Sequence, residues 1–299
     1  MPELPLVSVI TPCLNTGRFL RETIESVLSQ DYPRLEYIVM DGGSTDQTLA
    51  ILEEYTGRLT YSSGPDRGTA DAVNRGFRKA RGGILAFLNA DDTYLPGAVA
   101  AAVGALAAYP EAAMVYGDAY WVDGQSRVLG PYPTRPFDAV LLPQECFICQ
   151  PAAFLRREPL EAVGMLNPAL QYTFDYDLWI RMAQAHGMRK IEQFWATSRM
   201  HADSKTLGQR RGVLRETLQI LGRHFGYIPF RWIDAYASNL VDGRDQFFEP
   251  ARPSVVKYLL SLLVGLRYNP GYPLRFLSEW ASVMRVDGLI RRWHAFFHR

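Results

Sequence analysis

The fold is decided by the stretch Ile84–Asp92, which reads ILAFLNADD. Its first five residues, Ile84 to Leu88, have the length and composition of a buried strand of a parallel sheet. Open α/β sheets bind ligands at the carboxyl ends of their strands. Two carboxylates at that edge repel each other unless a positive charge lies beside them, and a divalent cation carrying a diphosphate is the simplest such partner. The alternative is an ordinary Asp-Asp turn before a helix.

Three earlier segments also run from an apolar stretch into polar residues. In one of them Asp41 closes the strand and two glycines follow, which let the backbone approach a ligand closely. Helices are expected between the segments, and the alternation over residues 6–90 predicts a doubly wound, mostly parallel α/β sheet. The segments are Val7–Pro12, which ends at a Thr-Pro stop, Leu35–Asp41, and Leu59–Ser63, which precedes the loop of Asp66.

Two longer stretches of the chain read VSVITPCLNTGRFLRETIESVLSQDYPRLEYIVMDGGSTDQT (residues 7–48) and GPDRGTADAVNRGFRKARGGILAFLNADDTYLPGAV (residues 64–99). Together they resemble the family 2 glycosyltransferases of the GT-A fold, and the resemblance covers roughly residues 6–205. It implies a GT-A type sheet followed by a C-terminal helical extension. It also implies inverting transfer of a sugar from a nucleoside diphosphate donor, usually assisted by Mg²⁺ or Mn²⁺.

The resemblance assigns several residues to the nucleotide. It implies that Asp41 hydrogen-bonds the nucleobase and that Asp91, the first of the acidic pair, faces the ribose or the donor sugar. Thr11 and Asn15 are expected in the first loop, lining the nucleotide pocket. Asp66 is the preferred nucleotide contact of the loop at 64–68, where this chain departs from its relatives. Asp71 and Asn74, on the following helix, are equally well explained as surface residues.

Metal and phosphate contacts are implied for two further segments. Asp92 corresponds to the metal-binding carboxylate of the acidic pair. The segment Arg199–Lys205 resembles the R-x-H segment that closes the donor site of the family. There His201 is expected near the metal or the diphosphate, and Arg199 or Lys205 is expected to neutralise phosphate charge.

The catalytic base is implied by the segment 172–179, which reads YTFDYDLW. Asp175 aligns with the base of the family, while Phe174 stands where many members have Glu. Direct displacement needs one base near the acceptor hydroxyl and charge stabilisation on the leaving diphosphate, which agrees with this assignment. Asp177 is better explained as a first-turn carboxylate that the helix dipole favours.

The predicted function is that of an inverting hexosyl- or N-acetylhexosaminyltransferase. It would move a sugar, from a UDP-sugar by preference, to a hydroxyl of a glycan or lipid-linked acceptor in cell-surface polysaccharide or glycolipid synthesis. A metal-dependent nucleotidyltransferase is the enzyme alternative, although a Gly-rich basic loop after the first strand is missing. A non-catalytic nucleotide-sugar-binding protein is the other alternative. No nucleic-acid-binding motif accompanies the basic residues, and the sequence makes no prediction about oligomeric state.

Composition indicates a folded globular chain, with 48% hydrophobic and 21% charged residues among 299. The expected domains are 1–205, with a nucleotide-binding half (1–110) and an acceptor half (111–205), and a helical extension at 206–299. Met114–Gly124 predicts a hairpin with its turn at Asp123-Gly124. No signal peptide and no apolar run of spanning length is found, and three cysteines suit a reducing compartment, so the cytoplasm is the expected location.

The C-terminal segment has its own character. Residues 250–299 hold eight Lys or Arg against two acidic residues, although the whole chain has a net charge of +1. The stretch Val255–Arg267 is strongly apolar but too short to span a bilayer, and Trp280, Trp293, Phe296 and Phe297 lie among arginines. This mixture predicts a surface that sits on an anionic membrane, such as the inner face of the plasma membrane. The alternative is a helical subdomain that packs on the catalytic core or on a second copy.

Overall fold

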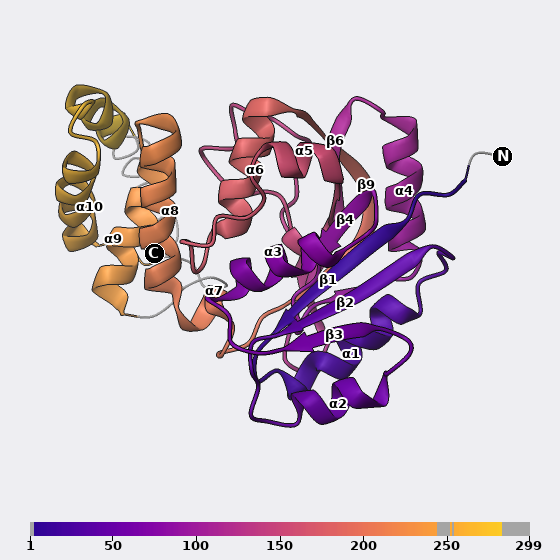
Figure 1. Cartoon of the computed structure of the whole chain (residues 1–299). Coiled ribbons are helices and arrows are strands. Elements are labelled where there is room, and N and C mark those ends of the chain that lie inside the picture. Colours follow the sequence, from indigo (N-terminus) through magenta and orange to yellow (C-terminus); the bar gives the residue numbers. More distant parts are fainter. Residues whose placement is uncertain (1–2, 244–251, 253, 283–299) are drawn as a thin grey trace, which may run out of the picture. The chain divides into compact units, whose positions relative to one another are not determined.

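The computed structural model describes residues 3–243, 252 and 254–282 (Figure 1). Contacts divide the chain into two compact units. The first unit comprises Met1–Leu142 and Cys146–His201, and the second comprises Pro143–Glu145 and Ala202–Arg299. Every strand found in the described part of the chain belongs to the first unit, and the second unit is helical.

One sheet runs through the first unit in the order β3-β2-β1-β4-β8-β6-β9-β5, with β7 paired to β6. The first four of these strands pair in parallel, so their carboxyl ends lie at one edge, as the sequence predicts. The rest of the sheet is mixed, because β8 is antiparallel to both of its neighbours while β6 and β9 are parallel. The strands are β1 (Val7–Cys13), β2 (Leu35–Asp41), β3 (Thr60–Ser63), β4 (Ile84–Phe87), β5 (Thr93–Tyr94), β6 (Ala112–Val122), β7 (Val128–Pro131), β8 (Ala153–Arg156) and β9 (Gly187–Arg199).

Strand β1 does not stop at its Thr-Pro pair, which corrects the predicted boundary. The carbonyl of Ile10 accepts a hydrogen bond from the Leu88 N–H, so Ile10 directs its backbone polar groups toward β4. Alternate residues of a parallel strand face the same neighbour, so Pro12 faces that side too. Pairing with β4 has already ended at Ile10, and the missing N–H of Pro12 therefore costs no ladder hydrogen bond. Pairing with β2 continues to Cys13.

Helices cover both faces of the parallel strands, which confirms the doubly wound prediction (Figure 1). Helices α1 (Gly17–Leu28), α2 (Thr48–Glu54) and α4 (Ala98–Ala108) share one apolar core with β1, β2 and β4. Helix α3 (Thr69–Lys79) packs on the other face, where the Phe77 ring lies 6.2 Å from the Phe87 ring. A Cβ atom on Gly76 would lie 2.5 Å from Ile10 Cγ2, so this glycine lets α3 approach the sheet closely.

The remaining elements of the first unit carry the predicted hairpin and the base segment. Strands β6 and β7 form the hairpin, and the Asp123 N–H donates to the Arg127 carbonyl at its turn. The helices here are α5 (Arg157–Ala162) and α6 (Phe174–Ala185). The ring of Phe174, at the start of α6, lies 6.3 Å from that of Phe87, at the end of β4. The start of α6 therefore lies beside the carboxyl end of β4, from which the chain continues to the acidic pair.

The second unit contains α7 (Lys205–Gly208), α8 (Arg210–Phe225), α9 (Phe230–Asp242), α10 (Val255–Tyr268) and a helical stretch at 273–282. A helical C-terminal part is thus present, as predicted. Helix α8 ends at Gly226, whose φ of 65° is the left-handed conformation that glycine adopts without strain. Among the residues that the structure describes, no helix is long and apolar enough to cross a membrane. The predicted membrane contacts of Trp293, Phe296 and Phe297 lie outside the described residues.

Candidate active site

The first loop and the loop after β2 are joined by Asn15. Its φ of 52° is in the left-handed region, which Asn tolerates better than most residues. The Asn15 N–H donates to Ser44 Oγ over 2.8 Å, and Asn15 Oδ1 accepts from the Thr45 N–H over 2.8 Å. Asn15 therefore lies in the first loop as predicted and fixes it against the residues that follow Asp41.

Thr11 lies elsewhere than predicted. It is a fully buried residue of β1 and not part of the first loop. Its hydroxyl accepts a hydrogen bond from Tyr37 over 3.0 Å, across the paired strand β2. The expectation that Thr11 lines the pocket from the loop is therefore wrong in position, because β1 continues through Pro12 to Cys13.

Asp41 ends β2 with its carboxylate surrounded by donors. It accepts from the N–H groups of Gly43 and Ser44, each over 3.1 Å, and from the hydroxyls of Ser44 and Ser63, each over 2.5 Å. Burial alone would raise the pKa of Asp41, but the hydrogen bonds from Ser44, Ser63 and Gly43 outweigh burial and hold that pKa below its usual value. Asp41 is thus an ionised acceptor at neutral pH. Ser63 was not predicted, although parallel pairing places it in register with Asp41.

Asp66 lies beside the same loop. Its Oδ1 accepts from the Gly68 N–H over 2.7 Å, and a Cβ atom on Gly42 would lie 2.7 Å from its Oδ2. The structure therefore brings Asp66 next to Asp41. Asn74 is buried and not a surface residue, because its amide bonds both backbone groups of Leu166, with the N–H at 3.1 Å and the carbonyl at 2.8 Å.

The acidic pair after β4 divides into a buried and a more open carboxylate. Asp92 is buried, and its Oδ1 accepts from the Arg199 N–H over 2.8 Å while its Oδ2 accepts from Asn89 Nδ2 over 3.3 Å. Burial, with the charge of Asp91, raises the pKa of Asp92 well above its usual range. A cation at this place would relieve the repulsion between the two carboxylates. Asn89, which sequence reasoning missed, stands within the same motif.

His201 contacts the more open carboxylate. Its Nε2 lies 3.1 Å from Asp91 Oδ2, and its ring packs 4.9 Å from that of Phe19 in α1. Within the described residues, the buried Nδ1 of His201 has no hydrogen-bond partner. The structure thus brings His201 to the acidic pair, as predicted, but against Asp91 and not against Asp92.

Arg199 was predicted to contact a phosphate, but the structure surrounds its side chain with protein groups. Its side chain is 1% exposed, so it does not face solvent or a phosphate. Its guanidinium donates to the Asp91 carbonyl over 2.7 Å, to Ser126 Oγ over 2.8 Å and to Glu22 over 2.7 Å. The end of β9, the β6–β7 turn and α1 are therefore tied together around the acidic pair. Glu22 and Ser126 carry no motif by which the sequence could have revealed them.

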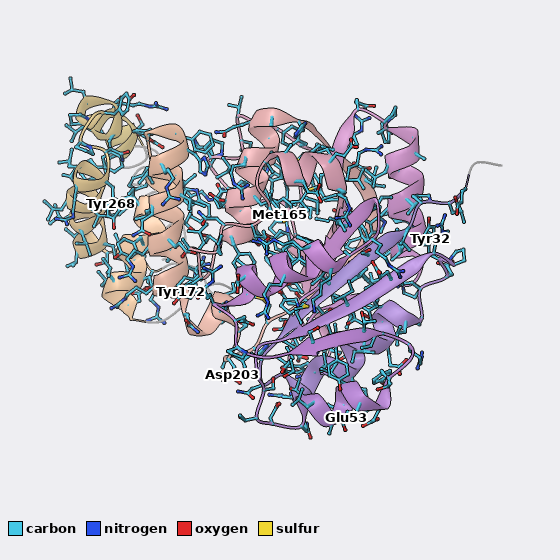
Figure 2. All side chains as sticks on the ribbon, viewed as in Figure 1. Tyr32, Glu53, Met165, Tyr172, Asp203 and Tyr268 are labelled. Atoms are coloured by element: carbon cyan, nitrogen blue, oxygen red, sulfur yellow. The ribbon has the colours of Figure 1, made fainter. Side chains whose placement is uncertain are left out.

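Asp175 lies in the first turn of α6, three residues after Tyr172, which Figure 2 labels. The pKa of the buried Cys149 thiol is raised by its burial and, in addition, by the charges of Asp92 and Asp175. Both carboxylates are therefore close enough to Cys149 for their charges to act on its thiol. Asp177 is buried and pairs with Arg181 over 2.9 Å, which agrees with its interpretation as a structural carboxylate.

The site is compatible with a divalent ion that a ligand helps to hold. No group of three His, Cys, Asp or Glu side chains among the described residues could bind a metal by itself. The open carboxylate of Asp91 and the imidazole beside it are nevertheless donors that suit Mn²⁺ or Mg²⁺ when phosphate oxygens complete the coordination, and the neighbouring Asp92 carboxylate adds negative charge.

Comparison with protein families finds that residues 8–164 match the model of glycosyl transferase family 2. An uncharacterized glycosyltransferase of Rickettsia prowazekii, RP339, is 28% identical over 215 residues, which cover 68% of this chain and 66% of the relative. The O-antigen biosynthesis protein RfbC of Myxococcus xanthus is 36% identical over 60% of this chain and 15% of its own length. A PGL/p-HBAD biosynthesis glycosyltransferase of Mycobacterium bovis is 33% identical over 59% of this chain and 69% of the relative.

Solved structures share the fold at lower identity. S. aureus TarS 1–349 in complex with UDP-GlcNAc has a TM-score of 0.59 and 16% identity, covering 91% of this chain and 92% of that one. The mannosyltransferase PcManGT of Pyrobaculum calidifontis, in complex with GDP-Man and Mn²⁺, has a TM-score of 0.59 and 18% identity, covering 99% of this chain and 81% of that one. The predicted GT-A fold is confirmed by these likenesses.

Proposed function

The chain belongs to glycosyl transferase family 2 and is a glycosyltransferase, and we propose that it transfers a hexosyl or N-acetylhexosaminyl group with inversion. The donor would be a nucleoside diphosphate sugar and the acceptor a hydroxyl of a glycan or lipid-linked molecule. The observation that carries this proposal is the meeting of Asp91, Asp92 and His201 beside the helix start that bears Asp175. A diphosphate anchor and a proton acceptor then share one edge of the sheet.

The nucleotide is proposed to lie over the loops after β1, β2 and β3. Asp41 would accept from a ring N–H of the base, since its hydrogen bonds keep it ionised. Asp66 lies beside it, and Asn15 holds the two loops in place. Uridine is the preferred base, although thymidine and guanosine present a suitable N–H too. Complexes of TarS with UDP-GlcNAc and of PcManGT with GDP-Man make uridine and guanosine the first bases to compare.

For the metal, we propose Asp91 and His201 as the direct ligands. A bound Mn²⁺ or Mg²⁺ would supply charge stabilisation for the leaving diphosphate. Asp92, which the family resemblance assigns to the metal, adds negative charge at the same place. Its buried carboxylate is already bonded by the Arg199 N–H, which supports a role in holding Asp91 and the end of β9 in position.

Asp175 is proposed as the base of the displacement. The acceptor hydroxyl oxygen attacks the anomeric carbon from the side opposite the diphosphate, and Asp175 takes the proton of that hydroxyl. The bond between the anomeric carbon and the diphosphate oxygen breaks, and the diphosphate leaves with the electron pair. Arg199 and Asn89 would hold the acidic pair in place throughout.

Cell-surface polysaccharide or glycolipid synthesis is the proposed setting. It is supported by relatives named for O-antigen and for PGL/p-HBAD biosynthesis. The proposed location is the cytoplasm or the inner face of the plasma membrane, where nucleotide sugars are available. Three cysteines that form no disulfide in the described part of the chain agree with a reducing compartment. The nucleotidyltransferase alternative finds no support in the family match.

Nucleotide-dependent thermal stabilisation tests the proposed site. UDP, dTDP, GDP and CDP are each added with Mn²⁺ and with EDTA. A ligand at a hundred times its dissociation constant stabilises the folded state by roughly 2.7 kcal/mol, which is a measurable shift in Tm. A shift with UDP that EDTA abolishes is expected, and Asp91→Ala should remove it. Equal shifts with and without EDTA would refute the metal site, and the absence of any shift would refute the nucleotide site.

A further inference from the structure

Helix α10 of the second unit buries small and polar residues and exposes apolar ones. Its buried residues are Lys257, Ser261 and Gly265, which lie four positions apart and so share one face. Globular proteins normally bury the apolar face of a helix and expose the polar one. Here the small and polar residues face inward.

Specific contacts within the second unit fix this orientation. The buried Lys257 donates to Asp242 over 2.7 Å and to the Arg252 carbonyl over 3.0 Å. A Cβ atom on Gly265 would lie 1.9 Å from the Phe276 ring, so that ring rests directly on the helix backbone. Trp280 Nε1 donates to the Tyr258 carbonyl over 3.2 Å. The helix cannot be rotated about its axis without breaking these contacts.

The opposite side of α10 is apolar and open to solvent. Val255, Val256, Leu259 and Leu263, here called the apolar face, are exposed by 74%, 61%, 56% and 65%. Figure 2 shows the side chains of this helix, whose last residue is Tyr268. The helical stretch at 273–282 adds Leu274, which is 80% exposed. A contiguous row of exposed branched side chains of this kind marks an interaction surface.

Positive charge accompanies the apolar face. Arg252, Arg267 and Arg275 are exposed in the same part of the chain. Glu279 is the one carboxylate of the described residues 252 and 254–282. It accepts hydrogen bonds from the Tyr227 hydroxyl and from the Phe230 N–H. In sequence, residues 283–299 add four arginines against Asp287 alone. Two copies meeting through this face would oppose arginine with arginine, whereas an anionic lipid surface offers both hydrocarbon and phosphate.

We propose that the apolar face of α10 docks on an anionic bilayer, with Val255, Leu259 and Leu263 entering the boundary between headgroups and acyl chains. Arg267 and Arg275 then contact lipid phosphates. A helix of 14 residues is about 21 Å long, too short to span the hydrocarbon core, so it lies along the surface. This interaction goes beyond the transfer reaction and does not depend on it.

Vesicle flotation of the full chain tests the proposal. The vesicles contain phosphatidylcholine alone or mixed with phosphatidylglycerol. The parent is expected to float with the anionic vesicles and much less with the neutral ones. The Leu259→Glu/Leu263→Glu double variant should lose at least roughly tenfold in partitioning, because two exposed leucines that would enter the bilayer are replaced by two charges that anionic lipid repels. Val128→Glu/Leu129→Glu is the matched control, since it changes two exposed apolar residues of β7, and it should float like the parent.

Three results would overturn the proposal: no flotation of the parent, equal flotation of the Leu259→Glu/Leu263→Glu variant, or equal loss in the β7 control. Sedimentation of the parent without vesicles distinguishes a second copy as the occupant, because a dimer that the same variant dissociates would assign the face to self-association. The nucleotide-dependent Tm shift of each variant shows that the chain is folded. It also separates failure of membrane docking from failure of the proposed donor site.

Discussion

Asp175 occupies the first turn of α6, where the helix N-terminus favours a carboxylate in its charged form. As the proposed base, it has to accept a proton at the moment of attack. Asp175→Asn keeps the shape and the helix start but removes the basic oxygen. Turnover is expected to fall roughly 10²- to 10⁴-fold while the dissociation constant for the donor stays within about twofold. Steady-state rates and donor-dependent Tm shifts measure the two quantities.

Asp177→Asn is the matched control for that change, two residues along the same helix. Asp177 is buried against Arg181, so its substitution should lower the free energy of unfolding and leave the chemical step largely intact in the folded protein. Parent-like turnover in Asp175→Asn, or a larger rate loss in Asp177→Asn, would remove Asp175 from the role of base.

Arg199 was expected to bind the diphosphate, but its guanidinium instead hydrogen-bonds protein groups around the acidic pair. Replacing it by Met removes the guanidinium donor from Glu22, from the Asp91 carbonyl and from Ser126, and among the described residues Glu22 keeps only the Ser126 hydroxyl as a donor. Arg199→Met is therefore expected to destabilise the protein by about 3 kcal/mol or more in urea unfolding. Glu22→Gln, at a side chain that is 47% exposed, should cost at most about 1 kcal/mol. A stable Arg199→Met protein that has lost only donor affinity would restore Arg199 as a phosphate ligand.

At the scale of elements, glycine has opposite consequences in two helices of similar length. Gly76 in α3 has no room for a methyl group, since its Cβ would lie 2.5 Å from Ile10. Gly76→Ala is expected to destabilise by about 1–3 kcal/mol, because crowding outweighs the better helix propensity of alanine. Gly104 in α4 has nothing within 4 Å of its Cβ position, so Gly104→Ala should stabilise by roughly 0.5–1 kcal/mol. Urea unfolding measures both, and a stabilised Gly76→Ala would contradict the close docking of α3.

At the scale of the whole molecule, the acidic pair links stability to pH. Burial and Asp91 raise the folded-state pKa of Asp92 above its value in the unfolded chain. The folded state therefore binds this proton more tightly. Protonation of Asp92 therefore stabilises the folded state. This contribution is fully present below about pH 4 and is lost as the pH rises through the pKa of Asp92 in the folded chain. In EDTA, the Tm of the parent is expected to fall relative to that of Asp92→Asn between about pH 4 and pH 8.

Added Mn²⁺ should narrow this difference at neutral pH, because the cation compensates the charge of the ionised pair. Thermal unfolding in matched buffers, with EDTA and with Mn²⁺, measures the effect for both proteins. A Tm difference that stays constant over this pH range would mean that Asp92 has an ordinary pKa in the folded chain.

Several features of this protein could be predicted from its sequence, because they depend on neighbouring residues. The alternation of apolar strands and helices determined the doubly wound sheet, and the family motifs determined the GT-A fold and the glycosyltransferase activity. Parallel strands place their carboxyl ends together, so the nearness of Asp66 to the loop that follows Asp41 also followed from strand order. The Asp123 turn of the hairpin was evident from two adjacent residues.

What only the tertiary structure decided is which partners these residues meet across long separations in the chain. Strand β9 lies between β6 and β5, which brings Arg199 to Asp91 and Asp92 and buries its guanidinium. Because β1 pairs with β2 beyond Pro12, Thr11 is a strand residue and not part of the first loop. Asn74 is buried because its side-chain amide hydrogen-bonds the backbone of Leu166, which lies far away in the sequence. The physical reason is that burial and hydrogen-bond direction depend on sheet order and packing. Residue type and local spacing do not encode them.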